Sequence, residues 1–264
     1  MTTPPASEAP LLNRRDGAVA HLRFNRPQVL NAIDAGMAGA FLSACKSIAG
    51  DASVRAVVIS GEGRAFMAGG DIASFGEGPQ AIADTLIAPM HEALQILAGL
   101  RAPVIASVQG AVAGAGMSLA LACDLAIAAD DARFNLAYVK LGTSCDLGAS
   151  WNLPRIVGLR RALEIALLSD GIDAAEALRL GLVNKVVPAA ALEAETQRLA
   201  ARLADGAPAA QGMLKRLMRD ALGHDFPAQL QAERQGFAAC AATADFSEGV
   251  AAFLEKRPAR YTGG

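Results

Sequence analysis

Short apolar runs, separated by polar or glycine- and proline-containing segments, recur along the first 190 residues. Runs of this length that are rich in β-branched residues are typical of buried strands. They predict strands at Ala18–Phe24, Val54–Ser60, Val104–Val108, Leu125–Ala128 and Val183–Val187. Stretches with helical periodicity lie between the early runs, at 34–49 behind the N-cap residue Asp34 and at 82–100. This alternation predicts an α/β fold with βα crossover units rather than an antiparallel sandwich.

From Arg160 onward the pattern is mostly helical. Asp173 and Glu176 form a capping box, with Gly181 at the far end of that helix. Further helices are predicted at 189–203, 208–222, 227–243 and 247–256, the last behind a second capping box made by Asp245 and Glu248. Their apolar faces pack either on a neighbouring subunit or back onto the core. We divide the chain into a core, residues 1–190, and a helical C-terminal oligomerisation region, residues 191–264.

The stretch from Ala102 to Cys123 has no charged residue and is long enough on paper to span a bilayer. It also contains Pro103, Gln109 and three glycines, which are typical of turns. A buried strand, a turn and a buried helix account for this pattern better than one membrane helix does. We therefore expect no membrane segment here.

Composition and charge narrow the class of protein further. With 264 residues, 53% of them hydrophobic, the chain can bury a large core. A formal net charge of −2 gives no electrostatic reason to expect nucleic acid as a partner. The four cysteines form no C-x-x-C pair, and three histidines are too few to build a zinc site with them. The first ten residues lack the basic and apolar regions of a secretory signal. We expect a cytoplasmic protein with free thiols.

Two glycine-containing segments, Ala65–Asp71 and Gly110–Gly116, each follow a β-branched apolar run and lead into a predicted helix start. Glycine permits positive φ and close approach to the main chain. The N–H groups at a helix start have no partner within the helix, so they can face a negatively charged oxygen. If the two segments meet in space, they would form an oxyanion hole with two donors.

Several motifs, in order along the chain, resemble those of the crotonase (enoyl-CoA hydratase/isomerase) superfamily. They are Asn25-Arg26-Pro27, Leu30-Asn31-Ala32, Ala65–Asp71, Gly110–Asp124, Leu153-Pro154-Arg155, Ala174–Gly181, Leu182-Val183 and Phe253-Leu254-Glu255-Lys256-Arg257. The resemblance implies a crotonase-like spiral of ββα units with a helical C-terminal region that builds a homotrimer or hexamer. It also implies an acyl-CoA thioester substrate, with coenzyme A as part of that substrate, and no metal or redox cofactor.

Carried over by position, the resemblance implies that the N–H groups of Gly70 and Ala115 form the oxyanion hole. A thioester that becomes an enolate gains negative charge on its carbonyl oxygen, and each preorganised donor stabilises that charge by roughly 3–4 kcal/mol. The alternative is that both residues merely permit tight strand–helix turns. The resemblance further implies substrate contacts at Gln28, Ala68, Ile72, Phe253 and Lys256. A lysine in the last turn of a helix is also expected from the helix dipole alone.

The two glutamates with which hydratases of this family position water and move its protons are absent. The first aligns with Ser118 and the second with Tyr138. Hydroxyl groups with ordinary pKa values are poor general bases at neutral pH. Efficient hydration by two carboxylates is therefore not expected, and we place Ser118 and Tyr138 in the substrate pocket.

One carboxylate, Asp146, lies in the right region of the sequence. It resembles the aspartate that family isomerases of unsaturated and ring-epoxide acyl-CoAs use as their base. A single desolvated aspartate, with its pKa raised by an apolar pocket, can take a proton from one carbon and return it to another. The alternative is that Asp146 caps the helix that begins near Gly148.

His91 also has two interpretations. Its spacing before Pro103 resembles that of the catalytic histidine in aryl-CoA dehalogenases of the family. In such an enzyme Asp146 would attack the ring and His91 would activate water. On a predicted helix, however, a histidine is more often a partly buried polar residue. Of the neighbours of Asp146, we expect Cys145 to be a structural thiol and Trp151 to belong to the core or a pocket wall.

The sequence therefore favours an acyl-CoA enzyme that stabilises a thioester enolate and isomerises an enoyl-CoA double bond. The candidate catalytic residues are Asp146 as base, Gly70 and Ala115 as oxyanion donors, and His91. The alternatives are an enoyl-CoA hydratase, an aryl-CoA dehalogenase or hydrolase using Asp146 and His91, and a non-catalytic acyl-CoA-binding protein.

Overall fold

A six-stranded sheet forms the centre of the protein in the computed structural model, which describes residues 9–73 and 78–264. Its strand order is β1-β2-β3-β4-β6-β9; β1 pairs antiparallel with β2 and the other neighbours pair in parallel. The strands are β1 (Leu11–Asp16), β2 (Val19–Phe24), β3 (Ala56–Gly61), β4 (Val104–Val108), β6 (Leu125–Ala129) and β9 (Lys185–Val187). All five predicted strands are present within one or two residues of their expected ends, and β1 is an addition.

A second sheet has the order β5-β7-β8 and consists of β5 (Ala111–Ala113), β7 (Arg133–Asn135) and β8 (Ile172–Asp173). Because β5 follows β4 and β7 follows β6, two successive turns of the chain each add one strand to each sheet. The predicted spiral of ββα units is thus confirmed. The uncharged stretch from Ala102 to Cys123 forms β4, β5 and the buried helix α4 (Ala115–Ala122). Among the described residues, no single helix is long and apolar enough to cross a membrane, although the bent pair α10–α11 passes on length and composition.

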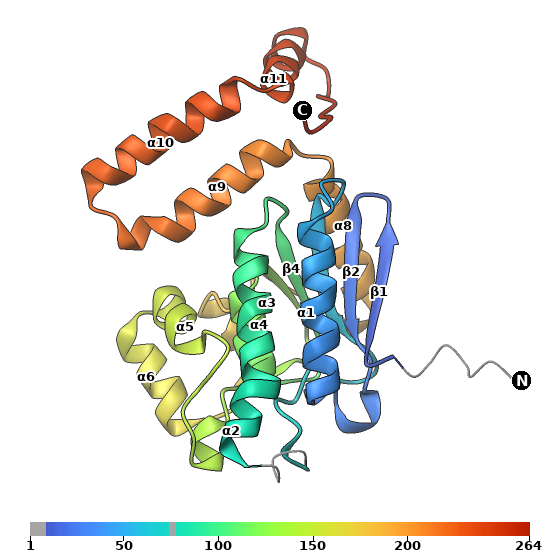
Figure 1. Ribbon diagram of the computed structural model, residues 1–264, viewed down its shortest axis with the longest axis vertical. Coiled ribbons are helices and arrows are strands. Elements are labelled where there is room, and N and C mark those ends of the chain that lie inside the picture. Colours follow the sequence, from blue (N-terminus) through green and yellow to red (C-terminus); the bar gives the residue numbers. More distant parts are fainter. Residues whose placement is uncertain (1–8, 74–77) are drawn as a thin grey trace, which may run out of the picture.

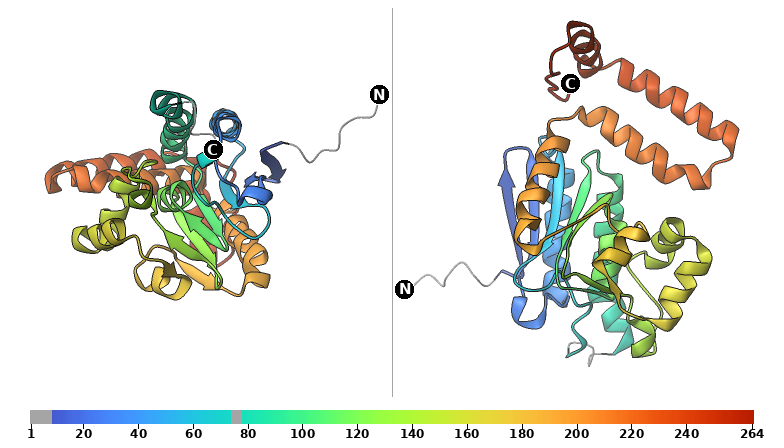
Figure 2. Two further views of the ribbon diagram at one scale, coloured as in Figure 1. Left: turned by 90° about the horizontal axis from the view of Figure 1, so that it is seen from below. Right: turned by 180° about the vertical axis from the view of Figure 1, so that it is seen from behind.

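Helices cover both faces of the large sheet (Figure 2). On one face lie α1 (Ala35–Ala49) and α3 (Ala88–Gly99), with β2 and β3 side chains such as Leu22 and Ile59 in the same core. On the other face α8 (Leu192–Ala204) packs on Val58 and Ile105. Alternate strand residues therefore serve two separate hydrophobic layers, as parallel strands buried on both faces require.

The expected helix at 82–100 is divided into three segments: α2 (Pro79–Ile82), the π-helical segment η3 (Ala83–Ile87) and α3. The remaining helices are α5 (Ala149–Val157), α6 (Leu159–Leu168), α7 (Ala174–Arg179), α9 (Pro208–Asp220), α10 (Phe226–Ala241) and α11 (Ala244–Glu255). Short 3-10 helices are η1 (Pro27–Val29), η4 (Tyr138–Leu141), η5 (Ala189–Ala191) and η6 (Ala221–Gly223).

The last three helices, α9–α11, extend away from the sheet at one end of the molecule (Figure 1). The base of this extension is held by an ion-pair cluster: Asp124, the residue before β6, contacts Lys215 at 2.8 Å and Arg219 at 2.7 Å. Since α8 packs on the sheet, the predicted boundary at residue 190 precedes a helix of the core. The oligomerisation role of residues 191–264 stays a prediction.

Two of the three predicted caps are correct and one is wrong. Asp34 accepts a hydrogen bond from Met37 N, and Asp173 accepts one from Glu176 N, both at 2.8 Å. The last helix, however, begins at Ala244 with Thr243 as its cap, not with Asp245. Asp245 is only 3% exposed and accepts hydrogen bonds from the N–H groups of Thr262 and Gly263. A tertiary contact with the chain terminus thus takes the carboxylate that the local pattern assigned to the cap.

Trp151 is not a core residue, because its side chain is 59% exposed. The guanidinium carbon of Arg155 lies 3.3 Å from the centre of its ring. Trp151 contributes to the wall of a groove of about 800 Å³ between the end of α3 and the helices α9 and α10. Of the two places expected for Trp151 from the sequence, the pocket wall fits the structure and the core does not.

Candidate active site

The two glycine-containing segments lie against each other. Met67 N donates to Ala111 O at 3.1 Å, and Ala113 N donates to Met67 O at 2.9 Å. A Cβ placed on Gly116 would lie 2.3 Å from Met67 O, so no larger residue fits there without movement of the backbone. Gly114, the residue before α4, has φ 51° and ψ −122°, a conformation that only glycine adopts readily. The glycines thus serve close approach and an unusual backbone turn, as the sequence suggested.

This contact brings the expected oxyanion donors into one region. A Cβ placed on Gly69 would lie 3.9 Å from the backbone nitrogen of Ala115. Over residues 9–73 and 78–264, the N–H groups of Gly70 and Ala115 donate no hydrogen bond to the protein. Ala115 is the first residue of α4, where the helix leaves its N–H groups without internal partners. Two unused donors on adjoining segments are what an oxyanion hole requires; the assignment itself stays a prediction.

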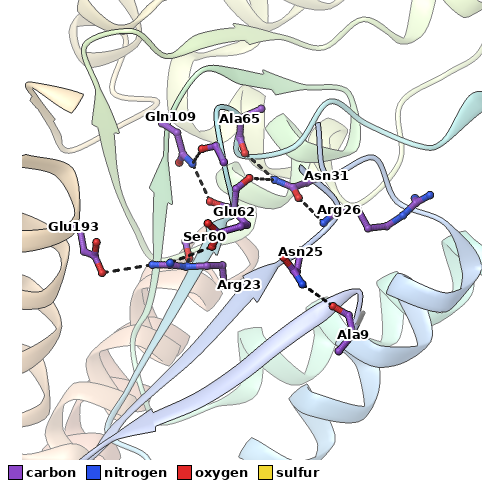
Figure 3. A network of polar contacts seen from close by, with 12 residues as sticks. Ala9, Arg23, Asn25, Arg26, Asn31, Ser60, Glu62, Ala65, Gln109 and Glu193 are labelled. Carbon is purple, nitrogen blue, oxygen red and sulfur yellow. Dashed lines mark hydrogen bonds and ion pairs between the residues drawn. The ribbon is translucent and has the colours of Figure 1, made fainter. Parts of the chain in front are cut away.

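A buried asparagine holds the first glycine segment in place (Figure 3). The Asn31 side-chain amide donates to the carbonyl oxygens of Glu62 and Ala65 at 2.9 and 2.8 Å, and its oxygen accepts from Arg26 N at 2.8 Å. Asn31 is fully buried and has φ 57°. This residue of the Leu30-Asn31-Ala32 motif therefore acts as a support for the loop that leads to Gly69 and Gly70.

Three of the predicted substrate contacts come from adjoining segments. Gln28 lies on η1, and Ala68 and Ile72 lie in and after the first glycine segment. Ala68 N donates to Leu30 O at 3.0 Å, and this bond joins the first glycine segment to the end of η1. Gln28 is exposed, and the Ile72 side chain is 58% exposed. Gln28 and Ile72 are therefore accessible at the edge of the glycine region and Ala68 is half-buried there; the substrate role of all three stays a prediction.

The other two predicted contacts, Phe253 and Lys256, lie elsewhere. Phe253 is on α11 and is 83% exposed, and Lys256 is the C-cap residue of that helix with φ 55°. In Figure 1, α11 lies at the opposite end of the molecule from α2. Within one chain these residues are therefore not brought to the site, and their predicted role requires a neighbouring copy.

The two positions that lack glutamate join Asp146 in a chain of hydrogen bonds. Ser118, on the second turn of α4 and fully buried, has its Oγ 3.0 Å from Tyr138 Oη. Tyr138 Oη in turn donates to Oδ1 of Asp146. Because Tyr138 gives its only hydroxyl proton to Asp146, Ser118 is the donor to Tyr138. Ser118 Oγ also lies 3.2 Å from Gly114 O, next to the Ala115 donor. The structure thus brings Ser118, Tyr138 and Asp146 together beside the oxyanion region.

Burial controls the titration of this chain. Burial raises the pKa of Asp146, while the hydrogen bond from Tyr138 opposes that rise. Burial also raises the pKa of Tyr138, and the nearby Asp146 charge adds to the effect. Tyr138 therefore remains protonated at neutral pH and donates to the carboxylate. A carboxylate with a raised pKa is a stronger base than an exposed one.

The capping interpretation of Asp146 has no support in these contacts. The N-cap residue of α5 is Gly148, and that helix start has no side-chain capping bond. Asp146 contributes only its backbone carbonyl there, which accepts from Ala149 N at 3.1 Å. Its carboxylate is directed to Tyr138 instead.

Two residues that the sequence analysis missed support Tyr138. Asn135 Oδ1 accepts hydrogen bonds from Ala137 N and from Ser169 Oγ, both at 2.7 Å. Ser169 is 1% exposed and Asn135 is half-buried. The pair holds the turn from which Tyr138 begins η4. In the sequence, the only indication of this Asn135–Ser169 pair was that each residue is a polar residue beside an apolar segment.

His91 lies beside the loop that holds Asp146, and its hydrogen bond there is to the backbone: His91 Nε2 accepts from Leu147 N at 3.2 Å. His91 is exposed as a whole residue on α3, and Cys145 is partly buried. Helix α3 and the loop before α5 are therefore joined immediately beside the candidate base.

Comparison with known proteins identifies the family, because residues 14–264 match the model of the enoyl-CoA hydratase/isomerase family. The chain belongs to this family. Similar proteins include a probable enoyl-CoA hydratase of Rhodobacter capsulatus, 40% identical over 246 residues, which cover 93% of this chain and 95% of that protein. The 1,2-epoxyphenylacetyl-CoA isomerase of Escherichia coli is 35% identical over 257 residues, 96% of this chain and 98% of that protein.

Among solved structures, an enoyl-CoA hydratase from Polaromonas superposes with a TM-score of 0.90 at 36% identity, covering 96% of this chain and 99% of that chain. The family resemblance and fold expected from the motifs are therefore confirmed. Relatives of the enoyl-CoA hydratase/isomerase family carry both hydratase and isomerase names, so family membership leaves the reaction open. No group of three or more possible metal-ligating side chains occurs within the residues described here.

Proposed function

We propose that this family member isomerises enoyl-CoA thioesters by moving a carbon–carbon double bond, with Asp146 as the base. The observation that carries the proposal is the hydrogen-bonded chain from Asp146 through Tyr138 to Ser118, which ends beside the Ala115 donor. This series of hydrogen-bonded side chains contains one carboxylate, whereas hydration by the two-glutamate route needs two. A proton shift needs one base that both removes and returns a proton.

For a 3-enoyl thioester the proposed steps are as follows. The thioester oxygen accepts hydrogen bonds from the N–H groups of Gly70 and Ala115, and Asp146 removes a proton from C2. The electron pair forms a dienolate whose charge rests on that oxygen; the double bond then lies between C2 and C3 when Asp146 returns its proton to C4. Coenzyme A enters only as part of the substrate, and the balance requires no further reactant.

The geometry of Asp146 suits this role. Tyr138 donates to Oδ1. We assign Oδ2 to the removal of the proton from the carbon acid. Tyr138 and Ser118 make the pocket less charged than a pair of glutamates would, which favours bulky or aromatic acyl groups. The similarity to an isomerase of 1,2-epoxyphenylacetyl-CoA supports testing aromatic thioesters.

The test is incubation of the purified protein with 3-enoyl-CoA and 2-enoyl-CoA in deuterated water, followed by mass spectrometry. We expect deuterium at C2 or C4 without a gain of water. Asp146→Asn should lower turnover by about 10²–10⁴-fold, the usual contribution of a general base. Binding of a saturated acyl-CoA, measured by titration calorimetry, should be retained. An Asp146→Asn protein as active as the wild type would contradict the proposal.

A second candidate is enoyl-CoA hydration, which the names of most similar proteins favour. In that reaction Asp146 would activate water, and the same assay would show a gain of one water molecule. Dehalogenation is less well supported, since the Nε2 lone pair of His91 is engaged by Leu147 N; chloride release from 4-chlorobenzoyl-CoA tests it. Binding of acyl-CoA without turnover of any of these would indicate a binding protein.

A further inference from the structure

The residue after the candidate base has an unusual backbone. Leu147 has φ 48°, in the left-handed region that bulky residues rarely occupy, and it is followed by Gly148 with φ 74°. The Leu147 side chain is fully buried in the main hydrophobic core. Strained backbone of this kind persists only where the surroundings hold it, and it occurs often at active sites.

One polar contact holds this turn from the side of α3. Leu147 N donates to His91 Nε2 at 3.2 Å, from a helix 56 positions earlier in the chain. The Asp146 carbonyl accepts from Ala149 N at 3.1 Å, which closes the turn on its other side. The backbone of Asp146 is thus fixed on both sides: His91 binds the N–H of the next residue, Leu147, and the start of α5 binds the carbonyl of Asp146 itself. Its carboxylate is then directed to Tyr138.

The direction of the Leu147 bond defines what His91 can do. A backbone N–H only donates, so Nε2 must supply a lone pair and the ring proton must be on Nδ1. The lone pair that a general base would use is therefore occupied. His91 is suited to hold the backbone beside Asp146 rather than to take a proton from water.

We propose that His91 is a positioning residue that sets the direction of the Asp146 carboxylate by accepting the hydrogen bond of Leu147. This inference rests on the proposed function, because it gives the positioned carboxylate the role of base. It predicts that any side chain with an acceptor at the Nε2 position will replace His91, whatever its acid–base properties. Glutamine meets this condition, since its Oε1 is the same number of bonds from Cα as Nε2.

The experiment compares His91→Gln and His91→Leu, with Gln95→Leu as a matched control. Gln95 is exposed and lies one turn further along α3. Two quantities are measured: kcat and KM with a 3-enoyl-CoA thioester, and hydrogen–deuterium exchange of the Leu147 amide. We expect His91→Leu to lower kcat on the order of 10²-fold with little change in KM, the usual effect of a displaced catalytic group. The Leu147 amide should exchange at least about tenfold faster, because its bond is lost.

His91→Gln should restore most of the turnover and the amide protection, and Gln95→Leu should resemble the wild type. Two results would overturn the inference: a His91→Gln protein as inactive as His91→Leu with Leu147 still protected, which would make His91 an acid–base catalyst, or a fully active His91→Leu protein. Absence of turnover by the wild type would instead overturn the proposed function. In that case hydrogen–deuterium exchange of the Leu147 amide in the two His91 variants still tests the His91–Leu147 hydrogen bond. Faster exchange in His91→Leu than in His91→Gln supports that bond, and equal exchange overturns it.

Discussion

At the scale of single residues, the site combines opposing influences on one carboxylate. Burial raises the pKa of Asp146, and the hydrogen bond from Tyr138 lowers it. The first influence makes the carboxylate a stronger base, and the second keeps it oriented and available in its ionised form. Asp146 and Tyr138 are eight positions apart and come from one loop region, so a short segment supplies both.

A raised pKa in the folded protein has a consequence for stability. The folded state then binds the Asp146 proton more tightly than the unfolded state, so ionised Asp146 destabilises the fold at a pH above both pKa values. Below both values the carboxyl is neutral in either state and the effect vanishes. We expect Asp146→Asn to be more stable than the wild type at pH 8, with a difference that shrinks as the pH falls through the folded pKa.

Thermal unfolding of both proteins at several pH values measures this difference. Asp170→Asn, at an exposed aspartate, is the control for the loss of one surface charge. An Asp146→Asn protein that is less stable than the wild type at pH 8 would show that the carboxylate stabilises the fold instead. The difference in stability between the two proteins measures the free-energy cost of the buried Asp146 charge, independently of its effect on turnover.

At the scale of elements, the site depends on how closely α4 approaches the first glycine segment. We expect Gly116→Ala to destabilise the protein by about 1–3 kcal/mol, because its Cβ would lie 2.3 Å from Met67 O. Turnover should also fall, because the neighbouring Ala115 N–H would move. Urea unfolding and the isomerase assay measure the two effects.

Gly39 offers the matched control. It lies in α1, where an added Cβ meets no atom within 4 Å. Gly39→Ala should therefore stabilise the protein by up to about 1 kcal/mol through helix propensity. If Gly116→Ala keeps wild-type stability and turnover, the close approach of the two elements is not needed for the site.

At the scale of the whole molecule, α6 presents apolar side chains to solvent. Leu159, Leu163 and Leu167 are 67%, 49% and 67% exposed and recur every fourth residue on one face. Exposed apolar stripes of this kind often mark protein interfaces. The homotrimer or hexamer stays a prediction, and this face is a candidate for part of its interface.

Analytical ultracentrifugation tests that prediction. We expect a mass about three or six times the 27.0 kDa of one chain. Leu167→Glu should shift the equilibrium toward smaller species, because a charge at an apolar interface is unfavourable. Arg202→Glu, an exposed charge reversal on α8, should not. A monomeric wild type would contradict the prediction and leave the roles of Phe253 and Lys256 without a structural route.

The sequence alone determined the features that depend on neighbouring residues. The β-branched runs of β3 and β4 and the caps Asp34 and Asp173 are local, so periodicity and capping preferences were sufficient to predict them. The family followed from the order of short motifs along the chain, each of which can be read without the fold. The polar strand β1 was missed because its exposed residues show no alternation of apolar positions.

Only the tertiary structure decided the rest. Thr243 caps α11 because the Asp245 carboxylate instead accepts hydrogen bonds from residues 262 and 263. Trp151 is exposed although its large apolar side chain suited a core. The sequence indicated Asp146 and His91 separately, but not that Leu147 joins His91 to the turn beside Asp146. Such contacts join residues far apart in the chain, and their free energies depend on burial and geometry that arise only when the sheets and helices have packed.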